Sequence, residues 1–229
     1  MALMEASVAA FGLLWSGDAT LWRIVWISLL TSVSGLLIAT PFAVGFGYLI
    51  ARCDFPGRRI VIWLAQVALS FPTVLIGLLL YLLLSRSGPA GQLHWLFSQS
   101  GLIAGQVLIA LPVLLAFTLA AVQAADPRLA ETAFTLGASR WGIFATVLHE
   151  VRFGVMAAII TGFGRVISEV GCALMVGGNI AGETRTITTA IALETSKGNF
   201  AQGIALGMVL IAIALVINAA LMLLQGDTR

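Results

Sequence analysis

Five long apolar segments determine what this chain can fold into. Each exceeds the roughly 20 residues that a helix needs to cross a bilayer. Only 10% of the residues are charged and 60% are hydrophobic, whereas about a quarter of a soluble domain is charged. Backbone in hydrocarbon must satisfy its own hydrogen bonds, and the alternating pattern of a lipid-exposed barrel is absent, so the segments predict helices. We predict an all-α membrane protein of about five transmembrane helices, which cover residues 22–50, 60–84, 102–125, 153–177 and 201–225.

The basic residues of the loops predict an orientation. Cytoplasmic loops carry an excess of Lys and Arg, so we expect the N-terminus outside and the C-terminus in the cytoplasm. Residues 1–19 are short for a span and lack the basic start of a signal peptide, which indicates an interfacial segment. We predict that residues 1–229 form a single transmembrane domain that includes this N-terminal segment. The expected cytoplasmic side holds Arg52, Arg58, Arg59, Arg128, Arg140, Arg152 and Arg229, and the other side holds Arg23, Arg86, Arg185 and Lys197.

A polar stretch, ETAFTLGASRWGIFATVLHE, separates the third and fourth apolar segments. Asp126-Pro127 is a strong helix start, with a capping carboxylate followed by proline at the first helical position. Gly137 can take the left-handed conformation that ends a helix, and Ser139 can cap the next one. We predict a cytoplasmic hairpin over residues 126–152, made of two short helices around a glycine elbow. By spacing alone, a connector packed on its own bundle and a docking element for a partner are equally good interpretations.

The hairpin resembles the coupling helices of permease subunits of binding-protein-dependent ABC importers. Their pattern is E-A-A, three residues, G, nine residues, then I-x-L-P. This chain reads Glu131-Thr132-Ala133, FTL, Gly137, nine residues and VLHE, so that His149 and Glu150 replace the closing leucine and proline. In the family the hairpin sits in a groove of the ATPase subunit. The resemblance therefore implies an ATPase-coupling role for Glu131, Thr132, Ala133, Gly137, Ala138 and Trp141.

The fourth apolar segment contains two opposite charges, Arg165 and Glu169, one helical turn apart. Charges at membrane depth are costly unless they are paired or face an aqueous interior. They could form an ion pair that neutralises itself within the bundle, or one of them could line the path of a charged solute. Glu169 is the better candidate for the second role, because small residues, Gly171 and Cys172, follow it.

A glycine-rich loop, VGGNIAGETRTITTA, follows at the expected outer face. Converging backbone amides together with Asn179 and Arg185 suit an anion. An equally good interpretation is a well-capped loop that leads into a short re-entrant or interfacial helix, Thr186 to Glu194. We take Glu169, Arg165, Asn179, Arg185 and Thr188 as candidates for the substrate path.

The runs ISEVGCALMVGGNI and TRTITTAIALETSKGNFAQGIALG resemble permeases of tungstate importers, which are related to the molybdate and sulfate permeases. The resemblance implies a homodimer with a path along its two-fold axis, two ATPase subunits, and an extracytoplasmic oxyanion-binding protein that docks outside. It further implies a multi-pass protein of a bacterial or archaeal plasma (inner) membrane, surrounded by lipid.

No phosphate-binding loop G-x-x-x-x-G-K-[ST] occurs in the sequence, so this chain is not expected to be an enzyme or to hold a cofactor. ATP and Mg²⁺ would bind the partner ATPase. We predict no catalytic residues and no metal site here. A net charge of +2 without a basic cluster gives no indication of nucleic-acid binding. The leading hypothesis is a tungstate permease, with molybdate or sulfate as alternative substrates. An ion-gradient-driven transporter and a non-transporting membrane scaffold are weaker alternatives.

Overall fold

The computed structural model describes residues 12, 15 and 17–225, and within them all regular elements are helical. The interfacial segment expected over residues 1–19 lies mostly outside the described residues, and Arg229 lies wholly outside them. The elements are α2 (Ala19–Arg52), α3 (Arg58–Ala68), α4 (Thr73–Leu84), η1 (Gly91–Leu93), α5 (Gln99–Ala124), α6 (Pro127–Thr135), α7 (Arg140–Glu150), α8 (Arg152–Ile167), α9 (Gly171–Gly177), α10 (Ile187–Ser196) and α11 (Phe200–Gln225).

Three continuous helices, α2, α5 and α11, are long and apolar enough to cross a membrane. They coincide with the first, third and fifth apolar segments, whose helices were predicted. Pro41 lies inside α2 and Pro112 inside α5. Neither proline ends its helix, as expected where neighbouring helices satisfy the freed carbonyl groups.

The second and fourth apolar segments differ from the prediction, because each is broken into two helices. α3 and α4 meet at 99°, and the break ends at Pro72, which caps α4 and has no N–H to continue a helix. The segment 153–177 is interrupted after Ile167 and resumes at Gly171. A further bend of 70° separates α7 from α8. By length and composition, the described residues contain three candidate spans, or up to five if α3–α4 and α7–α8 are each counted as one.

The helices pack closely at glycines. A Cβ atom on Gly35 of α2 would lie 2.5 Å from Cβ of Gln106 in α5, and one on Gly47 would lie 3.1 Å from Cβ of Thr118. The later residue of α2 faces the later residue of α5 in these two contacts, so α2 and α5 run in the same direction. Small residues allow such close approach between membrane helices.

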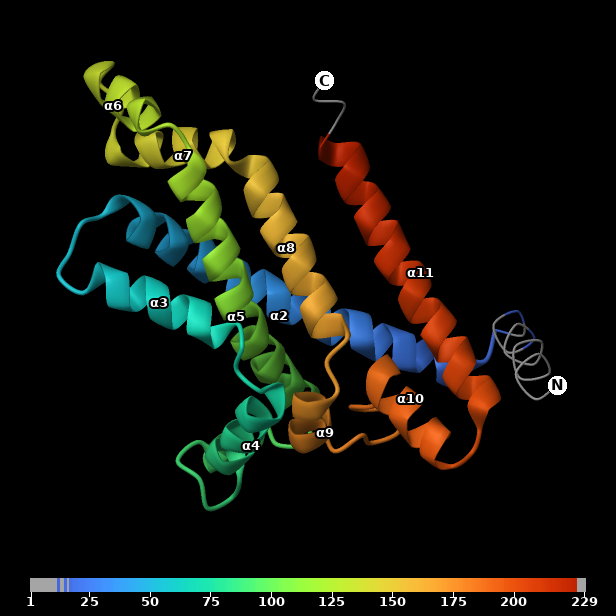
Figure 1. Cartoon of the computed structure of the whole chain (residues 1–229). Coiled ribbons are helices and arrows are strands. Elements are labelled where there is room, and N and C mark those ends of the chain that lie inside the picture. Colours follow the sequence, from blue (N-terminus) through green and yellow to red (C-terminus); the bar gives the residue numbers. More distant parts are fainter. Residues whose placement is uncertain (1–11, 13–14, 16, 226–229) are drawn as a thin grey trace.

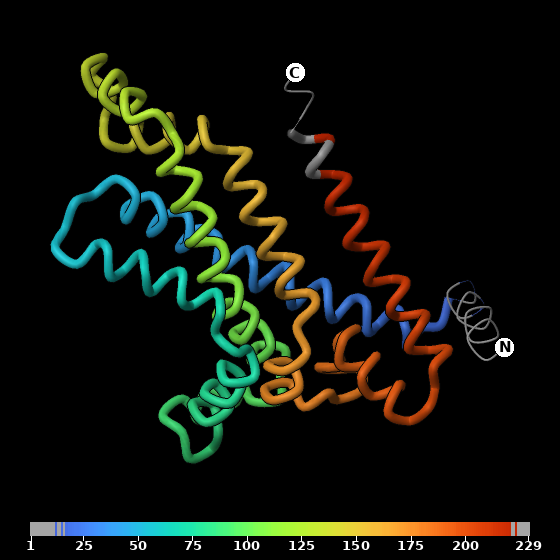
Figure 2. Tube along the Cα trace, viewed as in Figure 1, coloured from blue at the N-terminus to red at the C-terminus, as the bar shows by residue number. Residues whose placement is uncertain are grey.

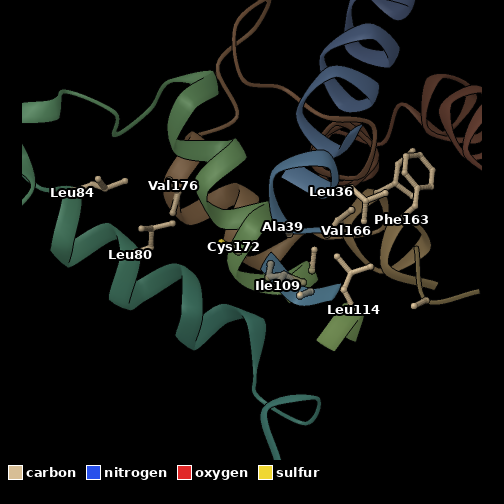
Figure 3. Packing of buried hydrophobic residues seen from close by; sticks show 14 residues of the cluster. Leu36, Ala39, Leu80, Leu84, Ile109, Leu114, Phe163, Val166, Cys172 and Val176 are labelled. Carbon is tan, nitrogen blue, oxygen red and sulfur yellow. The ribbon is translucent and has the colours of Figure 1, made fainter. Parts of the chain in front are cut away.

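The main core lies where α2, α4, α5, α8 and α9 meet. Figure 3 shows Leu36, Ile109, Leu114 and Val166 among the buried side chains of this cluster. A second cluster joins the N-terminal half of α2 to α10 and α11, and the tube in Figure 2 follows these three helices at one end of the bundle. In Figure 1, α6 and α7 lie at the end that the C-terminal half of α11 also reaches, while α4, α9 and α10 lie at the other end.

Candidate functional site

The polar hairpin has the caps that the sequence predicted. Asp126 Oδ1 accepts a hydrogen bond from the backbone N–H of Arg128 at 2.9 Å, with Pro127 in the first turn of α6. Gly137 has φ +81°, the left-handed conformation expected at the elbow. Ser139 Oγ accepts from the N–H of Gly142 at 3.2 Å at the start of α7. Two short helices around a glycine elbow are therefore confirmed as geometry.

The tip of the hairpin exposes large hydrophobic side chains. Phe134 is 71% exposed, Leu136 82% and Trp141 79%. Glu131, Thr132 and Gly137 are also exposed, while Ala133 and Ala138 are partly buried. Leu129, Ile143 and Leu148 contact the buried cluster of Val122, Val147 and Val151. Phe144 packs edge to face on Tyr48 of α2, with ring centroids 4.8 Å apart. The arrangement gives an apolar knob that nothing in the described part of the chain covers.

The C-terminal end of the hairpin, where α7 meets α8, has residues that differ from the family pattern. Val147 is fully buried, and its carbonyl accepts from the N–H of Val151 at 3.0 Å. Arg152 Nη1 donates to the carbonyl of His149 at 2.9 Å. These contacts end α7 at Glu150 and start α8 at Arg152 without a proline.

Arg165 and Glu169 form the ion pair that their spacing predicted. Arg165 Nη1 lies 3.0 Å from Glu169 Oε2, and their side chains are 40% and 3% exposed. The other carboxylate oxygen, Oε1, accepts from the N–H of Cys172 at 3.0 Å and so caps the first turn of α9. Glu169 is therefore fixed at the break between α8 and α9. The arginine, in contrast, keeps part of its guanidinium side chain at the surface of α8.

The threonines before and within α10 link the break between α8 and α9 to the rest of the bundle. Thr188 Oγ1 donates to the carbonyl of Glu169 at 2.6 Å. Thr186 and Thr189 form a capping box at the start of α10. On the other side, Ser28 Oγ of α2 accepts from the N–H of Ile187 at 2.7 Å. Three helices that are distant in sequence thus meet through hydroxyl groups.

The glycine-rich loop satisfies most of its own hydrogen-bonding groups. Arg185 donates to Oδ1 and to the carbonyl of Asn179, both at 3.3 Å. The carbonyl of Ile180 accepts three backbone amides, and Arg23 Nε donates to the carbonyl of Gly182 at 2.8 Å. Asn179 and Gly178 are both left-handed, with φ of 53° and 67°. The geometry favours the well-capped loop, because the donors expected to hold an anion already bind carbonyl and amide oxygens.

The structure thus brings Arg165, Glu169 and Thr188 together and places Asn179 and Arg185 as a separate pair in the adjacent loop. Together with Ser28, Thr186 and Thr189, the first three residues form what we call the α8–α10 junction. Sequence reasoning missed Ser28, Thr186 and Thr189. The signal was present for Ser28, because Ser28, Thr31 and Ser32 lie on one buried stripe of an otherwise apolar helix. Among the described residues, no group of three or more His, Cys, Asp or Glu could hold a metal ion.

Proteins of known family are similar to this chain in sequence and architecture. The family model described as "Binding-protein-dependent transport system inner membrane component" matches residues 43–226. A probable anion ABC transporter permease protein of Haloferax volcanii is 39% identical over 211 residues, which cover 89% of this chain and 91% of the relative. The tungstate uptake system permease protein TupB of Campylobacter jejuni is 37% identical over 209 residues, which cover 91% of this chain and 87% of the relative.

A solved structure has the same fold. It is a bacterial ABC transporter involved in the import of the acidic polysaccharide alginate, and one of its chains is similar with a TM-score of 0.74 and 20% identity over 96% of this chain and 84% of that chain. At this identity the likeness concerns the fold alone. The multi-pass helical bundle, the elbowed hairpin and the family match over most of the sequence lead to one conclusion: this chain belongs to the family of inner-membrane components of binding-protein-dependent transport systems.

Proposed function

We propose that this chain is the membrane permease of an ATP-driven importer that moves tungstate into the cytoplasm. The observation that carries the proposal is the similarity to a tungstate uptake permease over 91% of the chain. Tungstate and molybdate are tetrahedral oxyanions of equal charge, so molybdate is the first alternative substrate. Sulfate, a smaller tetrahedral dianion, is the second.

The hairpin couples the permease to a separate ATPase. In this proposal Phe134, Leu136 and Trp141 enter a groove on the ATPase subunit, and the polar residues around Glu131 and Gly137 form the rim. Exposed hydrophobic side chains at the tip support this role, because interfaces place apolar anchors at their centre and polar groups around them. ATP and Mg²⁺ bind the ATPase, and closure of its subunits turns the hairpin against α8 at Val151. An extracytoplasmic binding protein delivers the oxyanion.

The solute passes between two copies of the chain, along the outer face of α8. Thr161, Gly164 and Ser168 are exposed on this face, and Arg165 is partly exposed beside them. These side chains give a polar or small surface on a membrane helix, which suits a water-filled path. Arg165 supplies the attraction for a dianion, while its bond to Glu169 limits that attraction so that the anion is released. The N-terminus lies outside and the C-terminus lies in the cytoplasm of a bacterial or archaeal cell.

Proteoliposomes test this function. The full chain is reconstituted with its proposed partners, an ABC ATPase and an extracytoplasmic oxyanion-binding protein, and uptake of tungstate, molybdate and sulfate is measured by elemental mass spectrometry. We expect ATP-dependent uptake that is fastest with tungstate. Uptake driven by an ion gradient without ATP would refute the proposal of an ATP-driven importer. Faster uptake of molybdate than of tungstate would make molybdate the substrate.

A further inference from the structure

Three aromatic rings connect the exposed tip of the hairpin to α2. Trp141 and Phe144 of α7 pack edge to face, with ring centroids 5.7 Å apart and an angle of 89° between the ring planes. Phe144 in turn packs on Tyr48 of α2, at 4.8 Å and 86°. Trp141 is 79% exposed, whereas Phe144 and Tyr48 are partly buried. The row of rings therefore leads from the surface proposed for the ATPase into the bundle.

The contact between Tyr48 and Phe144 spans an open space. A cavity of about 590 Å³ lies between the last turns of α2 and the first turn of α7. Its walls include Gly45 and Leu49 of α2, and Arg140 and Ile143 of α7. Groups that face each other across such a space make no direct packing contact. In this stretch the two aromatic rings are therefore the point at which α7 is held against α2.

Tyr48 stands at a point where α2 is closely packed on other helices. The preceding residue, Gly47, is buried, and a Cβ atom there would lie 3.1 Å from Cβ of Thr118 in α5. The Tyr48 side chain also packs against the buried cluster of valines that contains Val122 and Val147. Closely packed interiors have low compressibility and transmit strain. A displacement of the Tyr48 ring is therefore passed to α2 and α5 together.

α2 extends this connection to the other end of the bundle. It is one helix from Ala19 to Arg52, and at 1.5 Å per residue Tyr48 lies about 30 Å along the axis from Ser28. Ser28 Oγ accepts from the N–H of Ile187 at 2.7 Å, within the α8–α10 junction. The hairpin thus has a second connection to the junction, in addition to the path through Val151 and α8.

We propose that Tyr48 is a positioning residue of the transport cycle, whose ring transmits the movement of the hairpin from Phe144 to α2. The inference rests on the proposed function and adds to it a side chain outside the hairpin, while Trp141 keeps its place in the ATPase groove. The ring pair can shift the equilibrium between two positions of α2 only by the difference in its interaction free energy. For an edge-to-face pair this corresponds to a factor of about two to ten.

Proteoliposomes that contain the full chain, an ABC ATPase and the oxyanion-binding protein test the proposal with Tyr48→Ala. Two controls accompany it. Tyr48→Phe keeps the ring, and Phe46→Ala removes a nearby ring of α2 that is 54% exposed and does not line the cavity. ATP hydrolysis and uptake of the oxyanion that the parent imports fastest are measured in the same vesicles, and association with the ATPase is measured by biolayer interferometry.

We expect Tyr48→Ala to import about fivefold less oxyanion per ATP hydrolysed, in the middle of the range for a lost aromatic pair. Its affinity for the ATPase should not change, and both controls should keep the ratio of the parent. Phe144→Leu removes the other ring and should cause a similar loss. The double variant should lose no more than either single one, because each change removes the same contact. Phe144→Leu supplies the decision if Tyr48→Ala fails to fold.

The outcomes separate this inference from the proposed function. Parent vesicles without ATP-dependent uptake would overturn both. If the parent imports the oxyanion and Tyr48→Ala keeps the same uptake per ATP, the inference alone is wrong. Weaker association of Tyr48→Ala with the ATPase would assign the ring to docking. An equal loss in Phe46→Ala would mean that uptake depends on any ring of α2, which would also overturn the specific role of Tyr48.

Discussion

The hairpin and the α8–α10 junction are both polar regions of an apolar bundle, but they satisfy their polar groups in opposite ways. The junction buries Glu169, Thr186 and Thr189 and pairs them with one another or with backbone groups. The hairpin is capped at both helices yet leaves Phe134 and Leu136 in the open. Polarity in this chain therefore marks two different things. The junction satisfies its polar groups internally, as suits a support within the bundle, and the exposed apolar side chains of the hairpin suit the docking role proposed for it.

The largest expected effect is at the junction, for Glu169→Ala. This variant leaves Arg165 without its partner and the N–H of Cys172 without its acceptor, so we expect a loss of about 2 kcal/mol in the free energy of unfolding. A buried pair costs about 3–5 kcal/mol to break, but Arg165 is 40% exposed, which lowers the cost. Thermal unfolding in detergent measures it. Glu169→Gln keeps an acceptor for Cys172 and should lose less; equal stability of the two variants would contradict the support role.

Next comes the hairpin, where the double variant Phe134→Ala with Leu136→Ala separates binding from stability. Both side chains are exposed, so thermal unfolding should stay within about 0.5 kcal/mol of the parent. Association with the ATPase, measured by biolayer interferometry, should weaken by about thirtyfold, as for loss of an interface anchor of about 2 kcal/mol. If the melting temperature falls and the affinity does not, the tip packs on its own bundle and the contrast with the junction disappears.

Gly137→Ala tests the elbow alone. A Cβ atom there would meet open space, so the cost is the left-handed backbone, about 1 kcal/mol. We expect ATP-dependent uptake to fall about fivefold. Gly142→Ala is the matched control: its Cβ would make ordinary contact with Ala138 at 3.4 Å, and alanine inside a helix is favourable. If uptake is lower in Gly142→Ala than in Gly137→Ala, the left-handed elbow at Gly137 is not the feature on which uptake depends.

The smallest effect is expected for Ser28→Ala, which removes the acceptor of the Ile187 N–H. Hydrogen bonds between membrane helices are worth about 0.6 kcal/mol on average, and the unfolding free energy should fall by that amount. The Thr40 hydroxyl donates to the Leu36 carbonyl within α2, so Thr40→Val should have no measurable effect on the link to α10. A larger loss for Thr40→Val than for Ser28→Ala would show that the link to α10 contributes nothing.

Much of the hairpin could be predicted because its determinants are local. Asp126 and Ser139 cap helices that begin within three residues of them, and Gly137 has the conformation its residue type favours. The three continuous spans followed from apolar length in the same way. The breaks at residues 69–72 and 168–170 were not predicted, because hydropathy does not distinguish a straight span from a bent pair.

The junction could be predicted only in part, because its contacts are long-range. The Arg165–Glu169 pair follows from helical spacing, whereas the bond from Ile187 to Ser28 joins residues 159 positions apart. Whether the donors of the glycine-rich loop were free for an anion likewise depended on the fold. Arg185 binds Asn179 across a turn that contains the left-handed residues 178 and 179.

The close contact of α2 and α5 limits how the molecule can move. If α2 slid by one turn along α5, Thr31 or Ala39 would replace Gly35 opposite Gln106, where a Cβ atom would come within 2.5 Å. The contact therefore opposes sliding of α2 along α5, and we expect the two helices to keep their register during a transport cycle. A change of angle at the 99° bend between α3 and α4, or at the 70° bend between α7 and α8, would leave this contact intact. The bend between α7 and α8 connects directly to the hairpin, so a small rotation at this bend would produce a large displacement of the far end of α8.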